Sequence, residues 1–589
     1  MANGTTAATA NESTPLLEDS GRSVSDSFPS QSASSRSTAA SSGAGPAAAS
    51  GTPGEEDDDD DGDGLDVPNQ KVTKKRAVAI ILSVYVLIFL LAVNMSGITM
   101  AQSTIAEDLD SYENAMWFTT SFLVAASTTS PLMGKLSSIF SPRNMVLASS
   151  VLFAVGCAMT AQAKSFASFI AGRVVTGMGG GGTMILAFIL VLELTTKRNR
   201  GLYIGLTNAG FTTGVSLGAV VFGAFIASTG WRTLFWIQAP VSLLAGCAIF
   251  FSIPSHLTSP GQQHDDDTPL GTKLKRLDYL GAFFLSATVV LFLFGLSANI
   301  QPIPLASSLG ALVAFVLIEK YVSRDPIIPL AVLLNRGALL SCVAQLGLMA
   351  ARWTVLFYAP VTALAVFGFN PAASGSILIP TNFGFGLGGL LVGAFHIRRA
   401  GSFWGPNLAC IFLFGASLLG LAASSAPSSP FALYVAVVFL NGLFTGGALN
   451  YTLAHLLHLT PARAHYEATG LLGTFRGFAG SFGSAVGGGI FARTLRRSLE
   501  EGFEGKGRRG EELVRKLIGS PLSVYHGDLS EAEKRVAVAG YTDALRTLFQ
   551  AAVVLTAIVI VVQAASGWEG AVDDDDADNG KAVDDGSSV

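Results

Sequence analysis

The sequence predicts an all-α protein that crosses a lipid bilayer many times. Half of its 589 residues are hydrophobic and only 13% are charged, and its mean hydropathy is +0.49; ordinary water-soluble domains do not have this balance. The hydrophobic residues form successive runs, each long enough for a membrane-spanning helix, which needs roughly 20 apolar residues. The composition excludes a nucleic-acid-binding protein. No nucleophile motif, phosphate-binding loop or metal cluster is present in the sequence, so we expect no enzyme activity, cofactor or metal site.

The first 76 residues are predicted to form a disordered cytosolic tail. They are rich in Ser, Ala, Gly and Thr and end in an acidic run, a composition that cannot bury enough apolar surface to fold. Within the tail, Glu12, Leu16 and Leu17 resemble an acidic dileucine sorting signal. This resemblance implies a sorting adaptor complex as a partner and the vacuole or lysosome as destination; chance occurrence is the alternative. Basic residues from Lys71 to Arg76 flank the first apolar run and favour a cytosolic N-terminus.

Six spans are predicted in the first half of the membrane region, residues 77–253. Arg173 lies near the start of the fourth span. An arginine inside hydrocarbon costs roughly 2.5–3.5 kcal/mol on insertion scales, so we expect it to face a polar cavity or a polar partner. The predicted ranges are 77–99, 115–139 and 145–163, then a fourth and a fifth span within 172–240, and 233–253.

The fifth span carries glycines at a regular spacing. Gly210, Gly214 and Gly218 are four residues apart, and Gly223 lies about one turn further on. This spacing removes side chains from one helix face, so that a neighbouring helix can approach closely.

A central insert and a second half of six spans complete the prediction. The insert, residues 254–338, contains a polar loop and two spans, and residues 339–565 form the second half, which gives fourteen spans in a 6+2+6 order. Residues 493–547 are expected to be a long loop, in which the amphipathic stretch 511–518 lies along the membrane surface. Residues 566–589 form an acidic tail, and both termini are predicted to be cytosolic. The six spans of the second half are 339–364, 373–396, 406–423, 431–457, 468–492 and 548–565.

Several motifs, taken in order, resemble the major facilitator superfamily. Arg173, the glycines from Gly177 to Gly182, the Gly210–Gly223 series and Trp231-Arg232 resemble the superfamily's fourth and fifth helices. The segments 94–109 and 117–123 resemble its branch of fourteen-helix drug:proton antiporters. This resemblance implies two parallel six-helix repeats with a substrate cavity between them near the bilayer midplane. Residues 105–109 and 177–182, with the dileucine-type tail, look like the vacuolar basic amino acid transporters of fungi.

The chain departs from the patterns of this branch in three places. Asn94 stands where the first-helix signature usually has Asp; because an amide cannot gain and lose a proton, proton coupling would have to use another residue. The gating turn after the second span keeps Gly134 and Arg143 but has Ser138 in place of the usual Asp. Ala219 stands where the antiporter motif has Pro, which weakens the inference of antiport.

The cavity implied by the resemblance is lined by the first, fourth, ninth and twelfth helices. For Arg352, which has no acid nearby in sequence, a substrate or coupling role and burial against backbone carbonyls both remain open. Arg476 in the thirteenth span resembles a family residue, and Glu193 is the acid that would pair with a cationic substrate. The polar candidates on the four cavity-lining helices are Asn94, Arg173, Gln345, Arg352, Asn441, Asn450 and Tyr451.

The leading hypothesis for function is proton-coupled transport of basic amino acids across the vacuolar membrane by a monomeric transport unit. The alternatives are a plasma-membrane exporter of drugs or toxins and a nutrient sensor that binds without transporting. One physical objection concerns charge. A carrier of lysine or arginine is expected to offer a carboxylate, whereas the predicted membrane cores hold arginines and almost no acids. An anionic or neutral small molecule would fit these charges better.

Overall fold

The computed structural model describes residues 66–67, 70–71, 74–194, 200–253, 278–296, 300–323, 335–396, 403–460 and 465–567. The dileucine residues Glu12, Leu16 and Leu17, most of the N-terminal tail, the polar loop 254–277 and the tail after Gly567 lie outside the described residues.

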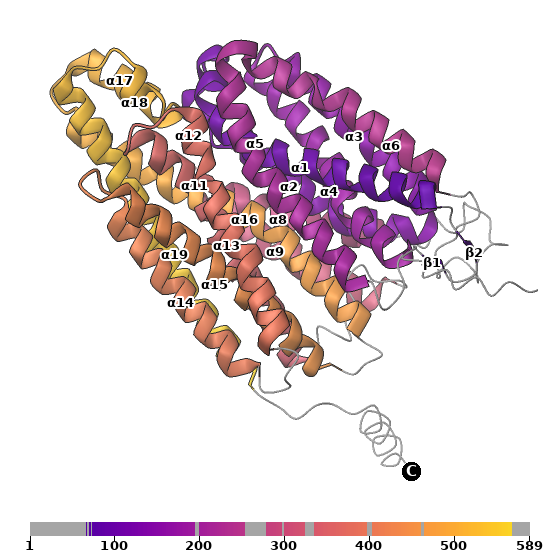
Figure 1. Cartoon of the computed structure of the whole chain (residues 1–589). Coiled ribbons are helices and arrows are strands. Elements are labelled where there is room, and N and C mark those ends of the chain that lie inside the picture. The colour runs from indigo at the N-terminus through magenta and orange to yellow at the C-terminus, as the bar shows by residue number, and fades with distance from the viewer. Residues whose placement is uncertain are drawn as a thin grey trace, which may run out of the picture. The chain divides into compact units, whose positions relative to one another are not determined.

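The first half is a bundle of helices (Figure 1). A short antiparallel pair of two-residue strands, β1 (Asp66–Val67) and β2 (Gln70–Lys71), precedes them. The first helix begins at Lys74, earlier than predicted, because hydropathy marks the membrane crossing while the helical hydrogen bonds continue into the basic flank. The helices are α1 (Lys74–Asp108), η1 (Tyr112–Asn114), α2 (Trp117–Ile139), α3 (Pro142–Ala161), α4 (Phe166–Leu194), α5 (Arg200–Trp236) and α6 (Gln238–Ser252).

A kink divides the long run of α5. Gly230 adopts a φ of 73° inside it, a left-handed conformation that glycine tolerates because it has no Cβ. The turn between the fifth and sixth spans therefore lies at Gly230, just before the predicted start of the sixth span at Thr233.

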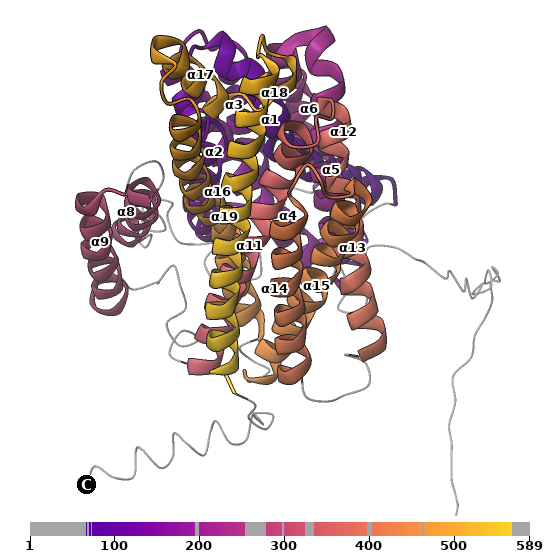
Figure 2. The same cartoon turned by 90° about the vertical axis from the view of Figure 1, so that its left-hand side faces the viewer.

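The central insert and the second half are also helical. α8 (Tyr279–Leu296) and α9 (Pro302–Tyr321) pack against each other and stand beside the main bundle, where α8 touches α2 and α16 (Figure 2). The second half consists of α11 (Arg336–Ala365), α12 (Pro371–Ser376), α13 (Leu378–Leu391), η2 (Val392–His396), α14 (Trp404–Ser424), α15 (Phe431–His458), α16 (His465–Gly502), α17 (Gly507–Gly519), α18 (Ser523–His526) and α19 (Glu531–Ala564).

Eleven helical runs in the described ranges are long and apolar enough to cross a membrane. One of them, Thr207–Ser252, contains both the fifth and the sixth predicted span, and neither α2 nor α16 is among the eleven. α16 is rich in glycine and ends in charged residues, which lowers its mean hydropathy. The prediction of an all-α protein with many membrane crossings is therefore confirmed, and the count of fourteen stays a prediction.

The two halves repeat one packing pattern. In the first half α5 packs on α1, α4 packs on both α2 and α3, and α6 packs on α3. In the second half α16 packs on α11, α15 packs on both α13 and α14, and α19 packs on α14. Each helix of the first half thus has a counterpart at the same place in the second, with α1 matching α11 and α4 matching α15. This correspondence is what two parallel repeats of one six-helix unit produce.

The halves meet closely at one end of the bundle, here called the η1 end because α1 ends there and η1 follows. α12 and α13 pack against α5, and α16 packs against α2. A Cβ added at Gly375 of α12 would lie 2.7 Å from the Ala219 carbonyl of α5. At the opposite end, Gly470, Gly473 and Gly477 of α16 have open space where a Cβ would lie, with no neighbouring atom within 4 Å.

The segment between the last two spans is ordered helix. α16 continues to Gly502, α19 begins at Glu531, and α17 and α18 lie between them at the η1 end (Figures 1 and 2). The amphipathic helix expected within 511–518 is present as α17, but Val514 and Leu517 on its apolar face are buried against protein. We expected this face to rest on the membrane; it packs instead on η1, α16 and α1, which offer a protein surface for the same apolar side chains.

Candidate functional site

Arg173 is fully buried inside the first half. Its Nε donates to the Phe118 carbonyl oxygen of α2 at 2.8 Å, and Nη1 donates to Oδ1 of Asn94 on α1. The guanidinium also lies over the Phe122 ring, 4.6 Å from its centroid. The remaining nitrogen, Nη2, has no hydrogen-bond partner, and no carboxylate pairs with Arg173, among the residues described. Neutral groups alone therefore hold this charge.

Asn94 uses both ends of its amide in this cluster. Its oxygen accepts from Arg173, while its Nδ2 donates to Oε1 of Gln238 on α6 at 3.0 Å. Gln238 in turn donates to the Leu234 carbonyl oxygen at 2.9 Å. An ionised aspartate at position 94 accepts hydrogen bonds only and could not donate to Oε1 of Gln238 as Asn94 does. The amide that departs from the expected first-helix pattern thus fits the network around it.

A second buried arginine, Arg352 of α11, occupies the second half. Its terminal nitrogens donate to the Thr381 hydroxyl and, at 3.2 Å each, to the Thr381 carbonyl, Oδ1 of Asn382 and Oδ1 of Asn441. Asn441 of α15 then donates to the Ser417 hydroxyl of α14 at 2.9 Å. Arg352 therefore ties α11, α13 and α15 together through uncharged oxygens.

This second cluster reaches across to the first half. Nδ2 of Asn382 donates to the Ser216 hydroxyl of α5 at 2.9 Å, and Ser216 can donate to the Leu378 carbonyl at 3.2 Å. Ser216 lies within the glycine series of α5. A continuous hydrogen-bonded chain thus links Arg352 to the helix of the first half that closes the η1 end.

The two arginine clusters are related by the internal repeat. In the first half the arginine is on α4 and its asparagine on α1; in the second half the arginine is on α11 and its asparagine on α15. Because α1 matches α11 and α4 matches α15, each half holds an Arg–Asn pair between the same two helices, with the residue types exchanged.

Arg476 lies in a third position, between the halves. It is half-buried on α16, and its Nη2 donates to Oδ1 of Asn208 on α5 at 3.4 Å. Nearby, the ring of Trp353 packs edge-on to Phe211 of α5 at 6.2 Å and stacks on Phe357 at 5.3 Å. A guanidinium and an aromatic cluster therefore lie where the two halves meet.

The glycine series of α5 has two different neighbours. A Cβ at Gly210 would lie 2.7 Å from the Tyr85 ring, one at Gly214 would lie 2.7 Å from the Ala92 Cβ, and one at Gly218 would lie 2.6 Å from the Val93 Cα, all on α1. Gly223, by contrast, faces the backbone of Pro371 in the second half, 2.6 Å from its carbonyl carbon. Three of these glycines let α5 approach α1, and the fourth lets the halves meet.

Residues 82–484 match the family model of the Major Facilitator Superfamily. This chain belongs to that superfamily. Its proteins are transporters and not enzymes, which agrees with the two-half membrane architecture described above.

Relatives within the superfamily include efflux transporters and vacuolar amino acid transporters. The MFS efflux transporter aclA of Aspergillus oryzae is 26% identical over 78% of this chain and 84% of its own length. The vacuolar membrane amino acid uptake transporter fnx2 of Schizosaccharomyces pombe is 24% identical over 71% of this chain and 72% of its own length. The vacuolar basic amino acid transporter 1 of Saccharomyces cerevisiae is 29% identical over 53% of this chain and 56% of its own length.

A solved structure shares the fold. It is a bacterial homologue of the human lysosomal transporter Spinster in an inward-facing, unoccupied conformation, with a TM-score of 0.56 at 14% identity over 84% of this chain and 99% of that one.

Three of the predicted cavity residues lie outside the arginine clusters. Gln345 of α11 is fully buried, and neither atom of its amide has a hydrogen-bond partner among the residues described. Asn450 donates to the Gly446 carbonyl of its own helix at 3.1 Å. Tyr451 meets the His396 ring edge-on at 5.5 Å. The backbone of Glu193 is in α4, but its side chain lies outside the described part.

The predicted gating turn of this superfamily member is held by local contacts. The guanidinium of Arg143 lies over the Phe250 ring of α6, 3.9 Å from its centroid. The Gly134 carbonyl accepts from the Ser137 hydroxyl at 2.6 Å. The side chain of Ser138, which replaces the usual acid, is outside the described residues.

Several members of the hydrogen-bond networks around Arg173 and Arg352 were not predicted from the sequence. Gln238, Asn382 and Thr381 are polar residues inside apolar runs, and this signal alone could have marked them. The Phe118 carbonyl and Ser216 carry no such signal, because a backbone oxygen and one serine among many do not stand out.

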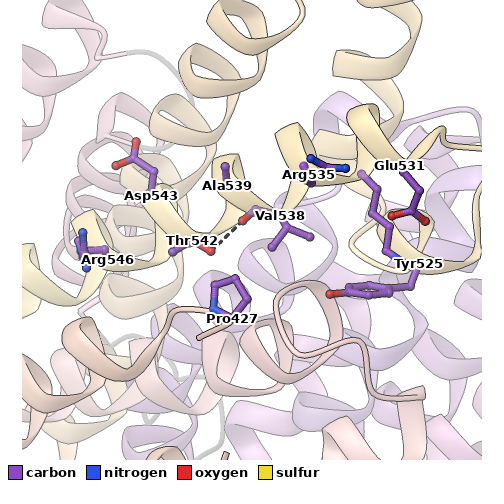
Figure 3. Close-up of a pocket in the computed structure, with 10 residues that line it drawn as sticks. Pro427, Tyr525, Glu531, Arg535, Val538, Ala539, Thr542, Asp543 and Arg546 are labelled. Atoms are coloured by element: carbon purple, nitrogen blue, oxygen red, sulfur yellow. Dashed lines mark hydrogen bonds between the residues drawn. The ribbon is translucent and has the colours of Figure 1, made fainter. Parts of the chain in front are cut away.

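A surface cavity of about 550 Å³ lies at the η1 end, apart from the arginine clusters (Figure 3). The start of α19 supplies most of its walls, including Glu531, Arg535, Asp543 and Arg546, and Tyr525 closes one side. Three basic side chains, Lys534, Arg535 and Arg546, line it together with two acidic ones, Glu531 and Asp543, so its charges largely offset one another.

Proposed function

We propose that this superfamily member moves basic amino acids across the vacuolar membrane by alternating access, driven by the proton gradient. The observation that carries the transport mechanism is the unequal contact between the halves. At the η1 end Gly223 and Gly375 allow backbone contact between α5 and α12, whereas at the other end Gly473 and Gly477 face open space. Such an arrangement gives access from one side only, as one state of an alternating-access carrier requires.

The predicted topology sets the direction of access. With the N-terminus in the cytosol, the open end faces the cytosol and the η1 end faces the lumen. A cytosolic solute would then enter this state and be released on the other side after the η1 end opens. The vacuolar relatives fnx2 and vacuolar basic amino acid transporter 1 support amino acids as the cargo.

A second candidate is export of a drug or toxin at the plasma membrane. The similarity to the efflux transporter aclA favours it, because that match spans more of this chain than the vacuolar matches do. A nutrient sensor that binds without transporting remains the third hypothesis, and only a transport assay separates it from the other two.

The deciding experiment is uptake of labelled lysine, arginine and histidine into vacuole vesicles from cells with and without this chain. We expect ATP-dependent uptake that requires the chain and collapses when a protonophore is added. If uptake is the same in both vesicle preparations, with the protein detected in them, vacuolar amino acid transport is excluded. Export of labelled toxins from whole cells then distinguishes an exporter from a sensor.

A further inference from the structure

Arg476 differs from the other two intramembrane arginines in how its donors are used. Arg352 donates to four oxygens, and Arg173 is enclosed by a carbonyl, an amide and an aromatic ring. Among the described residues Arg476 makes one hydrogen bond, to Asn208, at the long distance of 3.4 Å. A guanidinium has five N–H donors, so most of those on Arg476 remain available.

The face of α16 that carries Arg476 points between the halves. Gly473, Arg476, Gly477 and Gly480 follow the i, i+3, i+4, i+7 spacing of one helix face. A Cβ at Gly480 would lie 3.5 Å from both Leu123 of α2 and the Trp353 indole of α11. The hydrogen bond from Arg476 to Asn208 also reaches the first half. This face therefore contacts the first half at Arg476 and Gly480.

Open space adjoins this face one turn from Gly480, at Gly477. Gly473 and Gly477 are exposed, with no atom within 4 Å of the point where a Cβ would lie, and Arg476 is half-buried. Arg476 lies 11 residues into α16, or about 16 Å along the helix at about 1.5 Å per residue. Arg476 is therefore about three turns inside α16.

Aromatic rings close this space toward the η1 end. Trp353 packs on Gly480, and its ring meets Phe211 of α5 at 6.2 Å and Phe357 at 5.3 Å. A solute that reaches Arg476 thus finds a cation beside an apolar wall, a combination that suits a carboxylate attached to a hydrocarbon or aromatic body.

We propose that Arg476 binds the carboxylate group of the transported solute. The inference rests on the proposed transport function but not on the choice of substrate. A charge at this depth is costly unless it is paired, and no carboxylate forms an ion pair with Arg476 in the described part of the chain. The planar guanidinium matches a carboxylate through two parallel hydrogen bonds.

This assignment gives an intramembrane arginine a role in binding a basic amino acid, although it supplies no carboxylate for the cationic side chain. Every amino acid carries an α-carboxylate, so the arginine can hold the backbone end of lysine or arginine while the cationic end lies elsewhere. Organic acids exported as toxins carry the same group. The shared chemistry is the carboxylate, and the test separates its two sources.

The test measures binding to the purified full-length protein in lipid nanodiscs, with probes in pairs that differ by a carboxylate. The pairs are arginine with agmatine, lysine with cadaverine, and phenylacetate with phenylacetamide. The variants are Arg476→Gln and Arg476→Lys. Arg497→Gln is the matched control, because Arg497 is on the same helix but exposed, 2.8 Å from Glu501. Gel filtration and thermal melting establish that each variant is folded.

We expect the wild type to bind the carboxylate member of at least one pair about tenfold or more tightly than its partner, since hydrogen bonds to charged groups have that net strength. Arg476→Gln should lose this preference without weakening the carboxylate-free probe, Arg476→Lys should keep part of it, and Arg497→Gln should keep all of it. If only phenylacetate shows the effect, the carboxylate site stands and the amino acid proposal fails.

Three results would overturn the inference. The preference could survive in Arg476→Gln, which would leave basic amino acid transport intact but exclude this residue. Both members of a pair could weaken equally, which would indicate a structural role. Finally, folded wild-type protein could bind none of the carboxylate probes.

Discussion

At the scale of single residues, the buried charges of this transporter are stabilised by amides and carbonyls. Arg173 depends on Asn94 and the Phe118 carbonyl, and Asn94 also holds Gln238. An amide can serve both neighbours because it accepts at one end and donates at the other. The replacement of the expected aspartate by Asn94 therefore removes a titratable group and adds a hydrogen bond between α1 and α6.

Replacing Asn94 by leucine tests this view. The variant removes the acceptor of Arg173 Nη1 and the donor to Gln238 Oε1 in the buried core, so we expect it to lose about 1.5–3 kcal/mol of stability, the range for a lost hydrogen bond to a charged group. The melting temperature in detergent, followed by gel filtration, measures the effect. Asn450→Leu is the control, because Asn450 is half-buried and bonds only within α15. Equal losses in both variants would contradict a special role for Asn94.

At the scale of helices, close approach depends on glycines that face a neighbouring backbone. α5 lies against α1 through Gly214 and Gly218, where a Cβ would come within 2.6–2.7 Å of Val93 or Ala92. Real Cβ atoms do not approach other heavy atoms so closely, and at Gly218 the obstacle is the backbone of α1 itself. The two helices can stay this close only while Gly214 and Gly218 lack side chains.

Gly218→Val should therefore disturb the first half. The added side chain has to push α1 away, and overpacking of this kind costs typically 1–3 kcal/mol. We expect a lower melting temperature and reduced transport in vesicles. Gly310→Val is matched in chemistry but lies in α9, where nothing is within 4 Å of the added Cβ. A Gly218→Val protein as stable as Gly310→Val would show that α1 and α5 can separate without cost.

At the scale of the whole molecule, the segment 503–530 joins the two halves at the η1 end. It belongs to the second half but packs on η1 of the first, where a Cβ at Gly519 would lie 2.8 Å from the Tyr112 carbonyl carbon. Arg515 also pairs with Asp110 at 3.0 Å, with both side chains at least half exposed. Burial beside this contact also raises the pKa of the Tyr112 phenol above its ordinary value. Any opening of the η1 end has to break or carry along these contacts.

Packing should matter more than the ion pair in holding this segment. An exposed ion pair contributes typically 0.2–1 kcal/mol, so Arg515→Glu should change little. Gly519→Leu inserts a side chain into the backbone of η1 and should release the segment. Limited proteolysis of the folded protein measures the release as faster cleavage within 503–530. Faster cleavage of Arg515→Glu than of Gly519→Leu would reverse this assignment.

Parts of the candidate site could be anticipated from the sequence. Arg173 and Arg352 stand out because charges are rare in apolar runs, and Asn94 and Asn441 are polar residues within such runs. Their pairing could not be anticipated, because Arg173 and Asn94 are 79 residues apart and Arg352 and Asn441 are 89 apart. The opposite surroundings of Gly218 and Gly473 were equally hidden, since both are glycines on regularly spaced helix faces.

The sequence by itself determined the class of this protein, an all-α chain with many membrane crossings. In hydrocarbon every backbone polar group has to be satisfied within the segment, so long apolar runs have no alternative to helices. The tertiary structure alone decided which polar groups meet, at which end of the bundle the halves come into backbone contact and that Arg476 reaches Asn208 of the first half. Those outcomes depend on how helices distant in sequence pack against one another. The helical repeat predicts which residues share a face but not which other helix packs against that face.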